Sequence, residues 1–186
     1  MQIILASKSE RRREILQMFG VSFMVLGTDT DETADESLSP VELVSELSKR
    51  KAEAGLKIIK GIVIGADTIV SCESEIFGKP DDLTDAKRML QALNNKWHEV
   101  HTGITITNGF KTLTETETTR VKFRQVDEWE IEMYLNTCNV LDKAGAYAIQ
   151  ERAGMFIERI EGDYYNIVGL PICRLSVMLR QFGVFI

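Results

Sequence analysis

The sequence lacks the features of an exported, disulfide-bonded or membrane-spanning protein. Its three cysteines, Cys72, Cys138 and Cys173, are odd in number and show no close spacing, which favours reduced thiols. No apolar run approaches the roughly 20 residues that a membrane helix needs, and the N-terminus lacks the basic-then-apolar pattern of a signal peptide. We therefore expect a cytoplasmic protein with no membrane partner.

Basic residues are also fewer than acidic ones. The 22 Lys and Arg residues against 28 Asp and Glu give a net charge of −6. Because nucleic-acid-binding proteins usually present a basic face, we expect no nucleic-acid partner. A Walker loop, a dinucleotide fingerprint, internal repeats and low-complexity segments are absent from the sequence. The 44% hydrophobic and 27% charged residues are typical of a globular protein, and we expect residues 1–186 to form one domain.

Strand-like and helix-like segments alternate along the chain. The expected strands are residues 2–6, 21–26, 62–70, 100–107 and 115–123, and the expected helices are residues 9–19, 40–59, 81–93, 127–136 and 170–182. Asn108-Gly109 indicates a hairpin between the last two strands. This order predicts an α/β fold with a central sheet flanked by helices.

The junction between the first strand and the first helix carries hydroxyls and arginines. Ser7 and Ser9 follow the apolar strand, and Arg11 and Arg12 lie in the first helical turn. Cations are unfavourable there, because the helix dipole already makes that end positive. A serine cap, with Glu10 completing a capping box, explains the serines but not the arginines. A bound anion explains both, so the segment favours a polyphosphate site.

Asp67 interrupts the otherwise apolar strand at residues 62–70. An acid inside a buried strand needs a partner, because burying an unpaired charge is costly. Gly65 just before it leaves room for another group to approach the backbone. Asp67 is therefore a candidate metal ligand or general base, although an Asp bonded to a nearby loop explains the same pattern. Asp31 and Glu32 add carboxylates, which as hard oxygen donors suit Mg²⁺ or Mn²⁺ bridged to phosphates.

Lys79 lies between a glycine and a proline. The proline fixes the local backbone, so the ammonium is aimed, while Asp81 is placed to cap the next helix. A lysine in a turn is usually only solvated. Together with Arg11, Arg12 and Lys51, however, Lys79 forms a candidate phosphate clamp.

Two further segments combine glycines with aromatic and amide residues. They are residues 142–150 and 162–171. Glycines beside such residues fit a flat pocket in which the backbone approaches a ligand. The residues alone slightly favour a pair of tight turns around a buried tyrosine, and both interpretations stay open.

In combination these motifs resemble the Maf family of nucleoside triphosphate pyrophosphatases. The resemblance runs from residue 3 to about residue 180 and rests on Leu5-Ala6-Ser7-x-Ser9-x-Arg11-Arg12, Gly65-Ala66-Asp67-Thr68, Gly78-Lys79-Pro80, Thr102-Gly103, Asp142-Lys143-Ala144-Gly145-Ala146-Tyr147 and Gly162-x-Tyr164-x-Asn166-x-Val168-Gly169-Leu170-Pro171. Glu10 departs from the family pattern, which usually has proline at this position.

The resemblance implies a fold, a reaction and a set of site residues. The fold is an elongated mixed sheet flanked by helices, with two lobes around a central cleft, as in inosine triphosphate pyrophosphatases. The reaction is hydrolysis of a nucleoside triphosphate to the monophosphate and pyrophosphate with Mg²⁺ or Mn²⁺, by a homodimer. The implied residues are Asp67 as catalytic acid/base, Glu32 and Asp67 for the metal, Arg11, Thr68 and Gln150 for substrate choice, and Ser7, Ser9, Arg11, Arg12, Lys51 and Lys79 for the phosphates.

The segment ending at Gln150 resembles the dTTP/UTP subgroup of the family. An amide offers one donor and one acceptor, which match the N3–H and carbonyl edge of thymine or uracil, whereas guanine's adjacent donors suit a carboxylate better. Two alternatives stay open. One is a 7-methyl-GTP pyrophosphatase, which differs in base recognition. The other is a regulator of septum formation that binds nucleotide without turnover.

Overall fold

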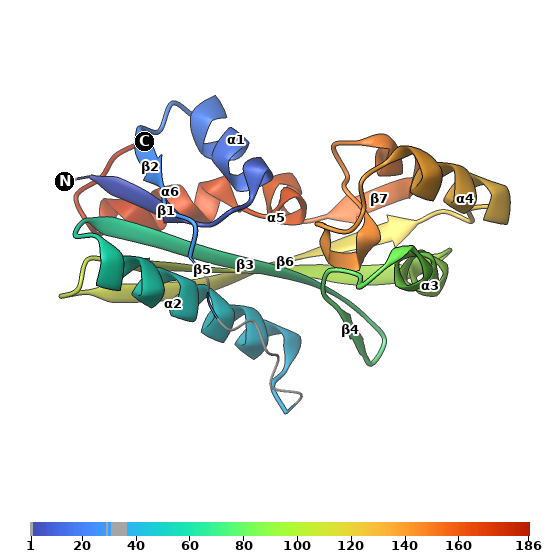
Figure 1. The fold of residues 1–186 in the computed structure, drawn as a ribbon, viewed down its shortest axis with the longest axis horizontal. Helices are drawn as coiled ribbons and strands as arrows, with labels where there is room; N and C mark the ends of the chain where they lie inside the picture. Colours follow the sequence, from blue (N-terminus) through green and yellow to red (C-terminus); the bar gives the residue numbers. More distant parts are fainter. Residues whose placement is uncertain (1, 29, 31–36) are drawn as a thin grey trace. The chain divides into compact units, whose positions relative to one another are not determined.

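The helices and strands follow the expected alternation. The computed structural model describes residues 2–28, 30 and 37–186 (Figure 1). The described strands are β1 (Ile3–Ala6), β2 (Phe23–Val25), β3 (Ile62–Cys72), β4 (Glu75–Phe77), β5 (Trp97–Thr107), β6 (Thr112–Phe123) and β7 (Ile157–Glu161). The described helices are α1 (Glu10–Met18), α2 (Pro40–Ile58), α3 (Leu83–Leu93), α4 (Glu128–Thr137), α5 (Tyr164–Val168) and α6 (Ile172–Arg180), with short 3₁₀ turns η1 (Ala144–Ala146) and η2 (Arg152–Phe156). Each expected segment forms its strand or helix, and β4, β7, α5, η1 and η2 are additional.

The strands of the described residues form one seven-stranded sheet. Its order is β2-β1-β3-β5-β6-β7, with β4 paired to β3. β1 runs parallel to both β2 and β3, whereas β4 is antiparallel to β3 and β7 is antiparallel to β6. The sheet is therefore mixed, and the expected α/β class is confirmed.

The chain divides into two compact units. Unit 1 contains Met1–Asp67, Thr102–Glu117 and Gly169–Ile186, and unit 2 contains Thr68–His101 and Thr118–Val168. Of the described strands, β3, β5 and β6 contribute residues to both units. The expectations of a single domain and of a central cleft stay predictions.

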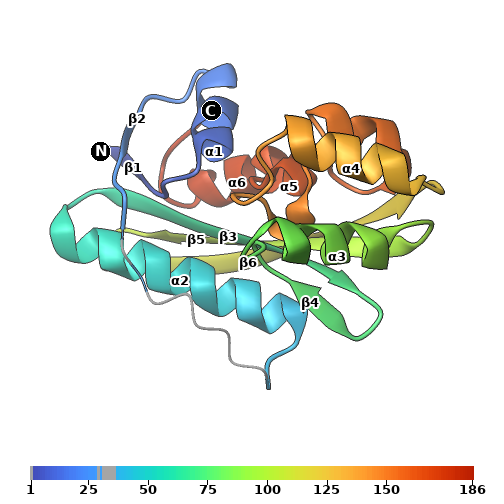
Figure 2. The ribbon, with the colours of Figure 1, turned by 45° about the vertical axis from the view of Figure 1, so that its right-hand side comes forward.

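Two glycines let α2 lie close to the strands of unit 1. A Cβ atom on Gly65 of β3 would lie 2.3 Å from the carbonyl oxygen of Ser48, and one on Gly103 of β5 would lie 2.1 Å from that of Val44. Both carbonyls belong to α2, which runs beside β3 in Figures 1 and 2. The group that approaches the backbone at Gly65 is therefore this helix.

We expect Gly65→Ala to destabilise the protein by about 3 kcal/mol, because the added methyl group meets helix backbone that cannot rotate away. The matched control is Gly78→Ala, since a Cβ at Gly78 meets nothing within 4 Å. Urea unfolding of both variants measures the difference. Equal unfolding midpoints for the two variants would contradict the close packing at Gly65.

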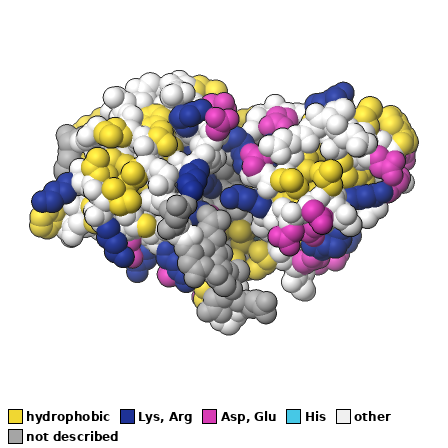
Figure 3. Space-filling view, viewed as in Figure 1, with side chains coloured by type: hydrophobic (Ala, Val, Ile, Leu, Met, Phe, Trp, Pro, Cys, Tyr) yellow, Lys and Arg dark blue, Asp and Glu magenta, His cyan; other side chains and the backbone are white. Residues whose placement is uncertain are grey.

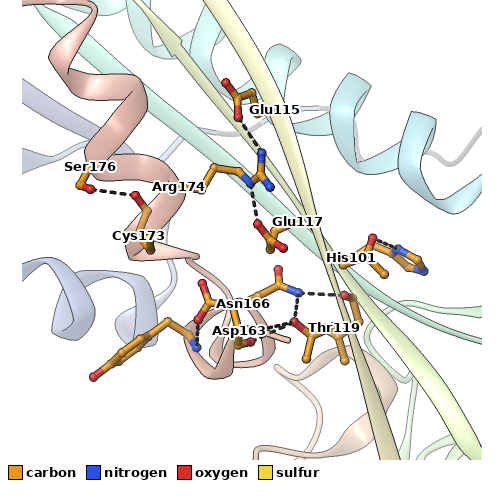
Figure 4. Close-up of polar contacts among 12 residues, drawn as sticks. His101, Glu115, Glu117, Thr119, Asp163, Asn166, Cys173, Arg174 and Ser176 are labelled. Carbon is orange, nitrogen blue, oxygen red and sulfur yellow. Dashed lines mark hydrogen bonds and ion pairs between the residues drawn. The ribbon is translucent and has the colours of Figure 1, made fainter. Parts of the chain in front are cut away.

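Arg174 joins α6 to β6 within unit 1. Its Nε donates to Glu117 at 2.6 Å, and its Nη1 donates to Glu115 at 2.8 Å (Figure 4). Both hydrogen bonds raise the pKa of Arg174, and the one to Glu117 makes the larger contribution. The C-terminal helix is thus held on the strand by a charged pair of contacts as well as by its apolar face.

The core of unit 2 contains a buried histidine–tyrosine pair. His98 Nε2 lies 2.8 Å from the Tyr147 hydroxyl, and both rings lie edge-on to Phe123. Burial lowers the pKa of His98 to about 3 and raises the pKa of Tyr147. Tyr147 is the buried tyrosine that the tight-turn interpretation expects. Further core residues of unit 2 are Val70, Phe77, Leu90, Leu93, Val100, Val121, Ile131 and Phe156.

The turn that leads into α5 is fixed to the strands of unit 2. The buried amide of Asn166 donates to the carbonyl of Val100 at 2.9 Å and to Oγ1 of Thr119 at 3.0 Å. Thr119 Oγ1 in turn donates to the carbonyl of Asp163 at 3.0 Å (Figure 4). Gly162 has a φ of +128°, which favours glycine. This segment therefore forms a structural turn.

Cys72, Cys138 and Cys173 form no disulfide. Within residues 2–28, 30 and 37–186, no helix is long and apolar enough to cross a membrane. Acidic and basic side chains both occur on the face drawn in Figure 3.

Candidate functional site

Asp67 is buried in β3 and forms an ion pair with Lys51 of α2. The Lys51 ammonium donates to Oδ1 of Asp67, and the two side chains are only 10% and 12% exposed. A charge buried to this degree needs a partner, as the sequence predicts. The close approach at Gly65, whose Cβ would lie 2.5 Å from the backbone nitrogen of Ala52, places Lys51 within reach.

The junction between β1 and α1 is held by its own serines and an arginine. Ser9 is the N-cap of α1, and its Oγ accepts from the backbone N–H of Arg12. Ser7 Oγ accepts from Ser9 N at 3.2 Å and from Arg12 Nη1 at 3.2 Å. Arg12 Nε donates to the carbonyl of Gly169 at 2.8 Å. The capping serine is therefore Ser9 and not Ser7. The buried Arg12 side chain connects Ser7 of this junction to Gly169.

The strand register brings this junction, which lies at the carboxyl end of β1, beside the middle of β3, where Asp67 lies. β1 and β3 are parallel, and Ala6 pairs with Gly65. Ser7 follows Ala6 directly, and Asp67 lies two residues beyond Gly65. In open α/β sheets ligands bind at the carboxyl ends of the strands. Unit 1 therefore brings together the acid and the hydroxyl–arginine segment that the sequence predicts to share a site.

Arg11 lies on the first turn of α1 and is half-buried. Arg13, two residues further along the same helix, donates to Glu10 at 3.0 Å in a solvent-exposed contact. The glutamate that replaces the family's usual proline is thus engaged with an arginine on its own helix. The role of Arg11 in phosphate binding and substrate choice stays a prediction.

The predicted metal ligands are described only in part. Glu32 and the neighbouring Asp31 lie outside the described residues. Within the part of the chain that the structure describes, no group of three or more His, Cys, Asp or Glu residues is placed to hold a metal ion. Asp67 is accordingly the described candidate ligand, and the metal site stays a prediction.

Unit 2 carries the remaining predicted site residues. Thr68 is half-buried in β3, Lys79 is exposed in the loop after β4, and Gln150 is exposed in the turn before η2. Their proposed roles are not tested by these positions. The loop of Lys79 is nevertheless fixed, because the carbonyl of Gly78 accepts from the backbone N–H of Gly145 at 3.0 Å.

The cap of α3 differs from the prediction by one residue. Asp82 is the N-cap, and its Oδ1 accepts from Asp85 N at 2.8 Å. The prediction that Asp81 caps this helix is wrong. Two adjacent aspartates compete for the same position, and either fits the sequence pattern of a cap.

Lys143 is a buried charge to which the sequence alone assigns no role. Its side chain is 5% exposed and donates to the carbonyl of Asn139 at 2.6 Å. The sequence signal that could have indicated its burial is its position directly before small residues and an aromatic, a composition typical of buried segments.

The comparisons with known proteins agree with one another. A family model described as Maf-like protein matches residues 2–182. A protein of Bacillus cytotoxicus called dTTP/UTP pyrophosphatase is 46% identical over 182 residues, which is 97% of this chain and 95% of the relative. A Bacillus anthracis protein of the same name is 46% identical over 184 residues, 98% of this chain and 96% of the relative. The solved structure of the Staphylococcus aureus Ham1 protein is similar at a TM-score of 0.51 and 16% identity, covers 98% of this chain and 100% of its own, and shows the fold alone.

Proposed function

We propose, since the chain belongs to the Maf-like protein family, that it hydrolyses dTTP and UTP to the nucleoside monophosphate and pyrophosphate. Relatives with this name match nearly the whole chain at 46% identity. The structural observation that carries the proposal is the buried pair of Asp67 and Lys51, which lies in the middle of β3 just beyond the residue that pairs with the end of β1.

The proposed reaction is attack of water on the α-phosphorus. The water's oxygen forms a bond to phosphorus, the α–β phosphoanhydride bond breaks, and the pyrophosphate leaves with the bonding electrons. Asp67 accepts the proton of the attacking water as general base. Lys51 holds the carboxylate of Asp67 in place through its ion pair. Arg11 and Lys79 are proposed to stabilise the negative charge of the departing pyrophosphate.

The residues fit a divalent cation of the Mg²⁺ or Mn²⁺ type. The carboxylate of Asp67 is a hard oxygen donor, and its ion pair with Lys51 involves Oδ1. Mg²⁺ is usually bound by one or two carboxylates together with substrate phosphates, so a full protein cage is not needed. When bound, such a cation supplies polarisation of the phosphoryl oxygens.

Gln150 is proposed to select the base. Its amide has one donor and one acceptor group, which match the imide edge of thymine and uracil. A buried donor left without a matching acceptor costs about 1–3 kcal/mol, which is enough to discriminate against guanine. Thr68 and Arg11 are proposed to share in substrate choice.

The purified protein is expected to release pyrophosphate from dTTP and UTP in the presence of Mg²⁺ or Mn²⁺, and to stop when the metal is chelated. Anion-exchange chromatography of the nucleotide products, with a coupled pyrophosphate assay, measures both products. A nucleoside diphosphate together with orthophosphate would overturn the proposed reaction. Faster turnover of 7-methyl-GTP than of dTTP would overturn the proposed substrate.

A further inference from the structure

A buried ammonium group lies next to the turn that carries Gln150. Lys143 donates to the carbonyl of Asn139 at 2.6 Å and to Oδ1 of Asp142 at 2.8 Å, and its Nζ lies 3.5 Å from Oε1 of Glu151. The contacts to Asn139 and Asp142 are hydrogen bonds, and the contact to Glu151 is an ion pair. Because the Lys143 side chain is only 5% exposed, water can replace these partners poorly.

The three oxygens come from both sides of the turn region. Asn139 follows the end of α4, Asp142 precedes Lys143, and Glu151 follows Gln150 directly. The backbone N–H of Glu151 also donates to the carbonyl of Ala148 at 3.1 Å. Lys143 therefore links Glu151, which follows Gln150, to Asn139, which lies just beyond the end of α4.

The same segment also holds the loop of Lys79. Gly145 donates to the carbonyl of Gly78, and its φ of +66° places it in the left-handed region. A Cβ on Gly145 would lie 2.9 Å from Cγ2 of Val70, so the turn packs tightly on β3. Within unit 2, Gly145 of η1 thus contacts the neighbour of Lys79, and Lys143, which directly precedes η1, contacts the neighbour of Gln150.

We propose that Lys143 is a positioning residue for base recognition, which acts by holding Glu151 and thereby the backbone on which Gln150 is presented. The inference rests on the proposed role of Gln150 in reading the pyrimidine. Lys143 touches neither the base nor the phosphates in this proposal. Because Lys143 itself has no role in the proposed hydrolytic step, its loss is expected to weaken the binding of dTTP and UTP more than it lowers kcat.

The test compares Lys143→Met with two matched controls. Lys143→Met is expected to raise KM for dTTP and UTP by about tenfold, with kcat changed by less than about threefold and KM for GTP changed little. Lys87→Met is the control for loss of a lysine that binds two carboxylates, because Lys87 pairs with Glu128 and Glu132 on the surface of the same unit. It is expected to behave as wild type.

A second variant tests the contact without removing the buried lysine. Glu151→Ala removes the oxygen that Lys143 holds, and the Glu151 side chain is 40% exposed, so the fold is expected to tolerate it. Its KM for dTTP is expected to rise by about three- to tenfold. The variant that combines Lys143→Met with Glu151→Ala is expected to have the same KM as Lys143→Met alone. Arg152→Ala controls for a change beside the turn, because Arg152 instead donates to Thr137 at 3.1 Å.

The outcomes separate the inference from the proposed function. If wild-type protein prefers dTTP and UTP to GTP and Glu151→Ala keeps both this preference and the wild-type KM, Lys143 is not a positioning residue. If kcat falls while KM is unchanged in Glu151→Ala, the contact serves the reaction step and the inference is overturned as well. If wild-type protein shows no preference for dTTP and UTP, the proposed function itself fails.

Discussion

Replacement of Asp67 by asparagine is expected to lower kcat for dTTP by about 1,000-fold, which corresponds to ~4 kcal/mol of transition-state stabilisation. The amide cannot accept the proton of the attacking water, and it is a poorer ligand for a divalent cation. The side chain is nearly isosteric, so β3 and the packing of α2 at Gly65 are expected to persist. Steady-state assays of pyrophosphate release measure the loss.

The control for Asp67→Asn must separate chemistry from folding. Glu53→Gln makes the same carboxylate-to-amide change on α2, where the Glu53 side chain is 51% exposed and pairs with Lys49. It is expected to keep wild-type activity. Asp67→Asn removes the ion pair to Lys51, so its melting temperature is expected to fall while circular dichroism stays native at 25 °C. Activity within about threefold of wild type would remove Asp67 from the mechanism.

Gln150→Glu is expected to lower kcat/KM for dTTP and UTP by about tenfold or more, the equivalent of ~1.4 kcal/mol. The carboxylate cannot donate to a pyrimidine carbonyl, and its charge repels the oxygen there. The same carboxylate suits the adjacent donors of guanine, so the loss for guanine nucleotides is expected to be smaller. Parallel kinetics with dTTP, UTP and GTP measure the ratio. Because Thr68 and Arg11 are proposed to share the discrimination, a complete switch is not expected.

Two controls make the Gln150 experiment specific. Glu151→Gln makes the reverse change, from carboxylate to amide, at the adjacent residue. Its amide oxygen can still accept from Lys143. It is expected to keep most of the preference for dTTP and UTP. Equal losses for all three nucleotides in Gln150→Glu would show that Gln150 supports the binding site without selecting the base.

The buried acid in β3 was the most predictable part of the site. A carboxylate inside an apolar strand must have a partner, and the structure provides one in Lys51. The identity of that partner could not be read from the sequence, because it depends on how α2 packs on β3 at Gly65 and on β5 at Gly103. Sequence patterns show that space is reserved at a glycine. They do not show which element fills it.

Other details depended on contacts between distant segments. The phosphate-binding role of Arg12 stays a prediction, and its hydrogen bonds to Ser7 and to Gly169, 157 residues along the chain, could not be read from the sequence. Lys143 stands in a motif that is visible in the sequence, but its partners at Asn139 and Glu151 become apparent only once the turns are folded. The strands and helices were predictable because their periodicity is local, whereas these contacts are not.

The boundary between the two units falls within β3, between Asp67 and Thr68. A single peptide bond therefore separates the proposed base of the hydrolytic step from a residue proposed for substrate choice, and covalent geometry fixes their Cα atoms at about 3.8 Å. With Gln150 also in unit 2, two of the three residues proposed for substrate choice lie in one unit, whereas Asp67, the proposed base, lies in the other. We therefore expect substitutions in unit 2 to change substrate preference while the proposed base in unit 1 is kept.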